Sequence, residues 1–212
     1  MPAPRVTSNS PWHLVFVLDD SGSMSGKPAN KLNEGIGAMI EEMKLISQGT
    51  KPYFKLSVVV FGSRPEVLAE AQSEQTIDKT KITSFSGSRG NTDMAGALNE
   101  TIEILKRKPG NATDFDPYVF LLTDGQPDHE ANALSSAQTL KNMEVAAGKP
   151  RLIAIGLGDN VNMTFLQQIA SNPELAKHVE DPDELTRLFP MIGTVVTSAG
   201  GTQAVDQAIV DI

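Results

Sequence analysis

The 212-residue chain contains no cysteine and few histidines, which are His13, His129 and His178. Without cysteine, the chain has no disulfide scaffold, no thiol nucleophile and no zinc-thiolate site. The three histidines are far apart in the sequence and show no His-x-x-x-His spacing, which disfavours a histidine-rich transition-metal site. A metal site in this chain is therefore expected to use oxygen ligands.

Positive charge is also scarce, because 18 Lys and Arg residues stand against 26 Asp and Glu, for a formal net charge of -8. The basic residues are dispersed, whereas nucleic-acid binding requires clusters that neutralise phosphates. No apolar run approaches the ~20 residues that span a bilayer, and the opening MPAPRVTSNS lacks the apolar core of a signal peptide. We expect a cytoplasmic protein that neither binds nucleic acid nor inserts into a membrane.

Buried-strand patterns alternate with amphipathic-helix patterns along the chain. Apolar runs predict strands at 12–18, 56–61, 118–122 and 151–155, and a short edge strand at 67–71. Helical spacing predicts a helix of about twenty residues from Pro28 to Gly49, and further helices at 94–105, 132–147, 165–169 and 185–196. This alternation is typical of a doubly wound α/β domain with a mostly parallel sheet covered on both faces. We place the domain at 12–197, between an N-terminal extension (1–11) and a C-terminal tail (198–212).

Polar side chains gather where the predicted strands end. Asp19, Ser21 and Ser23 follow the first strand at two-residue spacing, Thr92 begins a helix, and Asp124 follows the strand at 118–122. Because ligands in such sheets bind beyond the carboxyl ends of the strands, we expect these side chains to converge. Two carboxylates and three hydroxyls suit Mg2+ or Mn2+, which prefer oxygen ligands in near-octahedral geometry, with Ca2+ as a further candidate.

Serine and aspartate after a strand are also ordinary turn and helix-capping residues. The combination of three such loops, in this order, favours a metal site over unrelated turns. Two carboxylates leave little surplus negative charge beside a divalent ion, so the ion can still accept an anionic oxygen from outside. The predicted site is therefore suited to capturing an Asp or Glu carboxylate of a protein partner.

The segments VFVLDDSGSMSG, GNTDMAGAL and FLLTDG together resemble the von Willebrand factor A family and its metal-ion-dependent adhesion site. The pattern of that site is Asp-x-Ser-x-Ser, a distant Thr and a distant Asp, which correspond to Asp19, Ser21, Ser23, Thr92 and Asp124. The resemblance covers about residues 12–196. It implies a Rossmann-like sheet, mainly parallel with one antiparallel edge strand and flanked by helices. It also implies direct metal contacts from the two serines, a contact from the threonine, and aspartates that act directly or through water.

The segments DDSGSM and TDG are similar to the corresponding segments of stand-alone bacterial proteins of the tellurite-resistance-associated TerY-like group. That similarity implies a setting in a bacterial stress-response or assembly system. We interpret the chain as a non-enzymatic protein-binding module, and we expect the flanking residues Met24, Lys27, Arg89 and Gln126 to set partner choice. Lys27 and Arg89 either attract an acidic peptide or remain solvated charges. Asp20, at a variable position of the motif, is expected to face water or to sharpen cation selectivity.

A Mg2+-dependent phosphohydrolase that uses Asp19 as a phosphoryl-accepting nucleophile is the main alternative. Haloacid-dehalogenase-like enzymes place a second Asp two residues after the nucleophile, and here that residue is Ser21. No Gly-x-Ser-x-Gly elbow surrounds a serine, and nothing in the sequence positions a histidine beside one. The sequence therefore favours binding over catalysis.

The tail at 198–212 opens with a Ser/Ala/Gly stretch and then carries apolar residues at helical spacing, which are Val205, Ala208, Ile209 and Ile212. A helix this short is not stable alone. We expect the tail to pack on its own domain or to remain disordered, and docking on a partner or on a neighbouring copy of the chain is the alternative.

Overall fold

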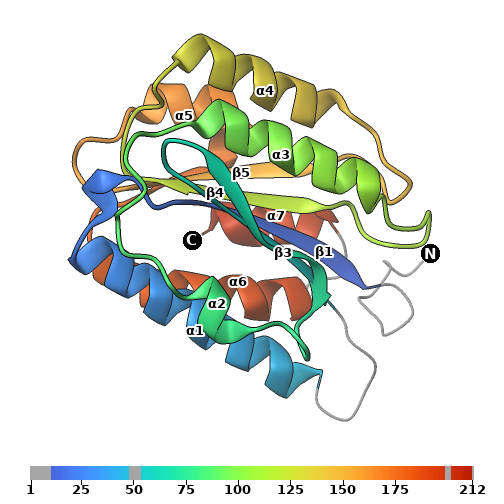
Figure 1. Cartoon of the computed structure of the whole chain (residues 1–212). Coiled ribbons are helices and arrows are strands. Elements are labelled where there is room, and N and C mark those ends of the chain that lie inside the picture. Colours follow the sequence, from blue (N-terminus) through green and yellow to red (C-terminus); the bar gives the residue numbers. More distant parts are fainter. Residues whose placement is uncertain (1–10, 48–53, 199–201, 212) are drawn as a thin grey trace.

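The computed structural model describes residues 11–47, 54–198 and 202–211, and within them six strands form one sheet with helices on both faces (Figure 1). The strand order is β3-β2-β1-β4-β5-β6. Neighbouring strands are parallel except β3, which pairs antiparallel with β2 at one edge. The predicted fold class, a mostly parallel Rossmann-like sheet with one antiparallel edge strand, is confirmed.

The strands are β1 (Trp12–Asp19), β2 (Phe54–Phe61), β3 (Pro65–Ser73), β4 (Tyr118–Thr123), β5 (Arg151–Leu157) and β6 (Ala176–Val179). The α-helices are α1 (Lys27–Ile46), α2 (Lys79–Ile82), α3 (Met94–Arg107), α4 (Glu130–Asn142), α5 (Met163–Ile169), α6 (Leu185–Ser198) and α7 (Thr202–Val210). Short 3-10 turns are η1 (Gly22–Met24), η2 (Pro173–Leu175) and η3 (Pro182–Glu184). Among the described helices, none is both long and apolar enough to cross a membrane.

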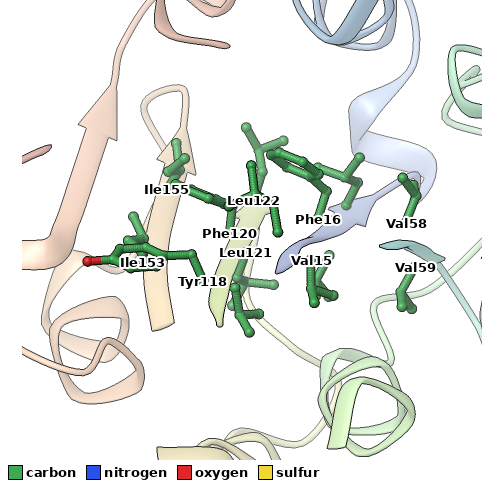
Figure 2. Packing of buried hydrophobic residues seen from close by; sticks show 14 of the residues in the cluster. Val15, Phe16, Val58, Val59, Tyr118, Phe120, Leu121, Leu122, Ile153 and Ile155 are labelled. Carbon is green, nitrogen blue, oxygen red and sulfur yellow. The ribbon is translucent and has the colours of Figure 1, made fainter. Parts of the chain in front are cut away.

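The core lies on both faces of the central strands, because all eight residues of β1 and all six of β4 are buried. Alternate side chains of a strand point to opposite faces. Figure 2 shows Phe16 and Phe120 on one face and Val15 and Leu121 on the other.

Helices α3, α4 and α5 cover one face, and α1, α6 and α7 cover the other (Figure 1). Phe16 meets Phe189 of α6, with 6.1 Å between the ring centroids. The burial of these apolar side chains between the helices thus fixes the positions of the strand ends.

Some element boundaries differ from the prediction. The helix expected at 132–147 is α4, which ends at Asn142 because the following segment turns back through a bridge between Val145 and Gly148. The β3 strand is longer than expected and contains a bulge, where Ala71 has a φ of 47°. The sequence did not indicate β6 or α2, which are four residues each.

The C-terminal helix α7 packs on the domain itself. Val205 and Ile209 on its apolar face are 0% and 3% exposed. Asp206 of α7 accepts a hydrogen bond from the Tyr118 hydroxyl and forms a 2.7 Å ion pair with Arg151. The expectation that the tail folds back onto its own domain is confirmed for these residues, whereas Ile212 lies outside the described residues. Self-association through the buried residues of the tail would require this helix to leave the sheet.

Candidate functional site

The candidate site begins at Asp19, the last residue of β1, beside the end of β4. The chain leaves β1 toward β2 on one side, while β4 lies on the other, so this is the point where the strand order reverses. Asp19 is 0% exposed. Its Oδ1 accepts a 2.8 Å hydrogen bond from the Ser21 amide, and its Oδ2 accepts a 2.7 Å bond from the Thr123 hydroxyl. The carboxylate is therefore held between the first and third loops of the site.

Two serine hydroxyls connect Asp19 to Asp124. The Oγ atoms of Ser21 and Ser23 lie 3.2 Å apart. Ser23 Oγ donates a 2.7 Å hydrogen bond to Asp124 Oδ1, across 101 residues of sequence. The structure thus brings two carboxylates and two hydroxyls into one contiguous group, as expected from the ends of neighbouring parallel strands.

Thr92 lies on a separate loop that leads into α3. Its amide donates a 3.2 Å hydrogen bond to Asp128 Oδ1, and its carbonyl accepts a 3.1 Å bond from the Asp128 amide. These two bonds join the Thr92 loop to the segment that follows Asp124. The structure therefore connects the second predicted loop with the third.

Sequence reasoning missed two residues that organise this site. Thr123 holds Asp19, and Asp128 holds the backbone of Thr92. A threonine at the last position of a buried strand and next to a candidate ligand was a usable signal for Thr123. Asp128 gave no such signal, because its role depends on how two loops meet.

Burial raises the pKa of Asp19 to about 6, hydrogen bonds from Ser21 and Thr123 oppose that rise, and the charge of Asp124 adds to it. Burial also raises the pKa of Asp124, against the hydrogen bond from Ser23. Both carboxylates are thus less stable as anions than in water, and a nearby cation would remove that cost. Among the described residues, no group of three or more His, Cys, Asp or Glu is placed to hold a metal. A cation here therefore needs the hydroxyls as well, and the donor set fits a hard divalent ion.

Asp20 does not face water, so that expectation is wrong, and it does not join the candidate ligands, whereas its effect on cation selectivity stays a prediction. The residue is 2% exposed, and its carboxylate accepts hydrogen bonds from the Ser86 and Gly87 amides and from Arg89 Nε. Its strand neighbour Asp19 points to the opposite side, as alternate residues of an extended segment do. Asp20 is thus a structural carboxylate inside the loop cluster.

The residues of the predicted partner-binding rim differ in their exposure to solvent. Met24 is 0% exposed and packs in the core, so the expectation that it contacts a partner is wrong for this conformation. Gln126 is exposed on the loop after Asp124, where a partner can reach it. The burial of Met24 follows from the 3-10 turn η1, which directs that side chain inward.

The two basic residues of the rim already pair with carboxylates of the chain. Lys27 Nζ lies 2.8 Å from Asp181 and 2.9 Å from Asp183. Arg89 Nη1 lies 2.6 Å from Glu66 Oε2. Both side chains are therefore paired, and Lys27 also remains in contact with solvent, because 53% of its side chain is exposed. Their pairing reduces the attraction that they can offer to an acidic partner.

A serine and a histidine do lie side by side in this protein, contrary to the sequence-based expectation. The Nε2 of His13 lies 2.8 Å from Ser57 Oγ. Ser57 is 0% exposed, and its oxygen also accepts a 2.9 Å hydrogen bond from the Ala71 amide at the β3 bulge. No substrate can reach a hydroxyl buried in this way. The pair therefore joins β1, β2 and β3 rather than acting as a nucleophile and base.

This pair predicts a pH dependence of stability. Burial, followed by the positive charge of Lys55, lowers the pKa of His13 to about 4. The stability contributed by neutral His13 is complete above its ordinary pKa of 6.5 and is lost as the pH falls toward 4, because only the unfolded chain takes up the proton. Between pH 7.5 and pH 4, we expect the native protein to lose about 3 kcal/mol more unfolding free energy than His13→Gln. Urea unfolding of both proteins measures this difference, and parallel pH curves would contradict it.

Three comparisons with known proteins bear on the fold and the family. The von Willebrand factor type A domain pattern matches residues 13–190. The inter-alpha-trypsin inhibitor heavy chain H4 of Sus scrofa is 29% identical over 197 residues, which cover 88% of this chain and 20% of that protein. The chain thus spans about a fifth of the length of the heavy chains that it matches.

Two solved structures extend the comparison. The manganese-loaded TRAP protein of Plasmodium vivax is 28% identical, with a TM-score of 0.62 over 86% of this chain and 74% of that chain. Proximal thread matrix protein 1 from the mussel byssus, with a zinc occupied MIDAS motif, has a TM-score of 0.68 over 93% of this chain and 48% of that chain. At 20% identity, the latter likeness concerns the fold alone. By its sequence pattern over 13–190 and by its fold, this chain belongs to the von Willebrand factor type A domain family.

Proposed function

We propose that this domain is a metal-dependent protein-binding module in which Asp19, Ser21, Ser23, Thr92 and Asp124 hold one divalent cation. The observation that carries the proposal is the hydrogen-bonded sequence from Asp19 through Ser21 and Ser23 to Asp124 at the strand-order reversal. The ion is proposed to be Mg2+, with Mn2+ as a substitute. The manganese-loaded TRAP structure, which is 28% identical over 86% of this chain, supports a divalent ion in this family.

The donor set also explains how such a module would bind a partner. Two carboxylates neutralise one divalent ion, and hydroxyls add no further charge. A third anionic oxygen can therefore join the ion without net repulsion from its immediate ligands. We propose that this oxygen is an Asp or Glu carboxylate of a protein partner, with the exposed Gln126 beside it. Lys27 and Arg89 contribute to partner choice only if their ion pairs open.

The burial of Asp19 argues against the phosphohydrolase alternative. A carboxylate nucleophile must approach phosphorus in line, yet Asp19 is 0% exposed and both of its oxygens accept hydrogen bonds. The proposed module is therefore non-enzymatic. A phosphatase assay with Mg2+ tests this point, and turnover that depends on Asp19 would favour the enzyme.

Calorimetric titration of EDTA-treated protein with Mg2+ and Mn2+ tests the metal site. We expect one site in the native protein and a 10- to 100-fold or larger loss of affinity in Asp124→Asn, because that variant removes one of the two carboxylates. Glu130→Gln is the matched control, since Glu130 is an exposed acid in the first turn of α4, close in sequence to Asp124. Equal binding by native protein and Asp124→Asn, or no binding by native protein, would overturn the assignment.

A separate experiment tests the capture of a carboxylate. Protein-bound Mn2+ enhances the relaxation of solvent protons, and the size of this enhancement depends on how many water molecules are bound to the ion. Acetate added to the Mn2+-loaded protein should displace a water and lower the relaxation enhancement, whereas acetamide should not. Equal responses to the two compounds would argue against capture of an anionic oxygen. The bacterial stress-response or tellurite-resistance setting and the cytoplasmic location remain predictions from the sequence.

A further inference from the structure

The carboxylate of Asp20 forms a second set of contacts next to the candidate metal site. It accepts hydrogen bonds from the consecutive amides of Ser86, at 2.8 Å, and Gly87, and from Arg89 Nε at 3.1 Å. Consecutive backbone amides that converge on one anion form a nest, which here is filled by a side chain of the protein itself. With a side-chain exposure of 3%, the Asp20 carboxylate is shielded from water. This arrangement attaches the loop at 86–89 to the loop that begins at Asp19.

The same loop packs against the backbone that carries the serine ligands. Gly87 has a φ of 67°, and a Cβ at that position would collide with the backbone of Ser25 and Met24. The Arg89 amide donates a 3.0 Å hydrogen bond to the Asp20 carbonyl, and the Gly22 amide donates a 2.9 Å bond to Gly90 O. The first and second loops of the site are therefore joined on both sides of the Asp20 side chain.

From this junction the chain runs directly to Thr92. The Ser63 amide donates a 2.8 Å hydrogen bond to Arg89 O, and the Asp93 amide donates a 2.7 Å bond to Gly62 O. The backbone between Arg89 and Asp93 is thus held at both ends against the turn after β2. The position of the Thr92 backbone therefore depends on where the loop at 86–89 is held, together with the hydrogen bonds to Asp128.

We infer that Asp20 is a positioning residue for the metal site, which holds Thr92 in place for the cation without touching the cation itself. This inference rests on the proposed function. The two adjacent aspartates then have different roles, because Asp19 is a ligand and Asp20 fixes the loop that supplies another ligand. The negative charge of Asp20 is already compensated by two amides and one guanidinium, so it adds little to the charge at the metal.

The test compares Mn2+ affinity in Asp20→Ala, Asp20→Asn and Glu66→Gln by calorimetry, with folding checked by circular dichroism. Asp20→Ala should weaken Mn2+ binding about tenfold or more with all five proposed ligands intact. In Asp20→Asn the side-chain carbonyl still accepts both amides but the contact with Arg89 is lost, so most of the affinity should return. Glu66→Gln removes the other carboxylate partner of Arg89 and should bind as the native protein does. Hydrogen exchange at Ser86 and Gly87 should accelerate in Asp20→Ala and not in Glu66→Gln.

The outcomes separate this inference from the function on which it rests. If the native protein binds Mn2+ and folded Asp20→Ala binds it equally well, the positioning role is overturned while the metal site stands. If the native protein itself does not bind Mn2+, both proposals fall. Should Asp20→Ala fail to fold, Asp20→Asn decides: it must bind Mn2+ measurably more weakly than Glu66→Gln, and equal affinities would overturn the role.

Discussion

Replacing Asp19 with asparagine is expected to make the metal-free protein more stable and to abolish its response to metal. At pH 7 the free energy of unfolding should rise by about 2 kcal/mol. The reason is that burial raises the pKa of Asp19 from 3.8 to about 6, so ionised Asp19 costs about 3 kcal/mol in the folded state. Part of that gain is offset because asparagine forms weaker hydrogen bonds than a carboxylate does.

The geometry allows this exchange. The side-chain carbonyl of an asparagine can accept the Ser21 amide, and its NH2 can donate to Thr123 Oγ1, whose proton then turns toward Gly125 O at 3.3 Å. The same variant lacks a charged ligand, so millimolar Mg2+ should raise the melting temperature of the native protein and not that of Asp19→Asn.

The sign of the pH effect provides a second check on Asp19→Asn. A group whose pKa is higher in the folded state holds its proton more tightly there, so its ionised form destabilises the fold above pH 6 and the cost disappears toward pH 3.8. The advantage of the variant should therefore shrink between pH 7 and pH 4.5 in urea unfolding with EDTA. Glu144→Gln, which removes an exposed charge, is the control and should show no such trend. A variant that is less stable than the native protein at pH 7 would contradict the argument.

Gly62→Ala is expected to destabilise the protein by about 2 to 3 kcal/mol and to weaken metal binding at least tenfold. Gly62 lies directly after β2, and a Cβ there would collide with both the Cβ and the carbonyl oxygen of Arg89. Backbone atoms cannot move aside as a flexible side chain can. The loop from Arg89 to Thr92 would have to shift, and with it the 2.7 Å hydrogen bond from the Asp93 amide to Gly62 O.

Gly125→Ala is the matched control for this prediction. Gly125 follows Asp124 in the third loop of the site, but a Cβ at that position has no heavy atom within 4 Å. This variant should stay within about 0.5 kcal/mol of the native protein and bind metal normally. Urea unfolding and Mn2+ calorimetry measure both effects. If the two glycine variants behave alike, the close approach of Arg89 does not position the metal-binding loop.

The sequence was most informative where strands are buried on both faces. Strands β1, β2, β4 and β5 appear as continuous apolar runs because helices cover both sides of them. The edge strand β6 was missed because Ala176–Val179 has only one fully buried residue and therefore no apolar pattern. The end of α4 was missed because a tertiary bridge between Val145 and Gly148, rather than a local stop signal, sets it.

The same distinction applies to the candidate site, where some features are set by the local sequence and others by tertiary contacts. Side-chain type and spacing identified Asp19, Ser21 and Ser23, which are local in sequence. The partners of Asp20 are backbone amides of residues 86 and 87, and any residue type carries such an amide. No sequence pattern therefore indicates that Asp20 is buried. Met24 was misassigned for a related reason, since a 3-10 turn rather than the motif decides which way it points.

The central position of β1 has a consequence for how this chain folds. β1 is the first described strand, yet one of its two neighbours is β4, and the hydrogen bond that joins their ends links Thr123 to Asp19 across 104 residues. During synthesis, one edge of this fully buried strand stays without its native neighbour until β4 is made. We therefore expect β1 to be the segment most exposed to aggregation before folding completes. The carboxylate of Asp19 is then shielded from water only once β4 pairs with β1 and Thr123 binds it.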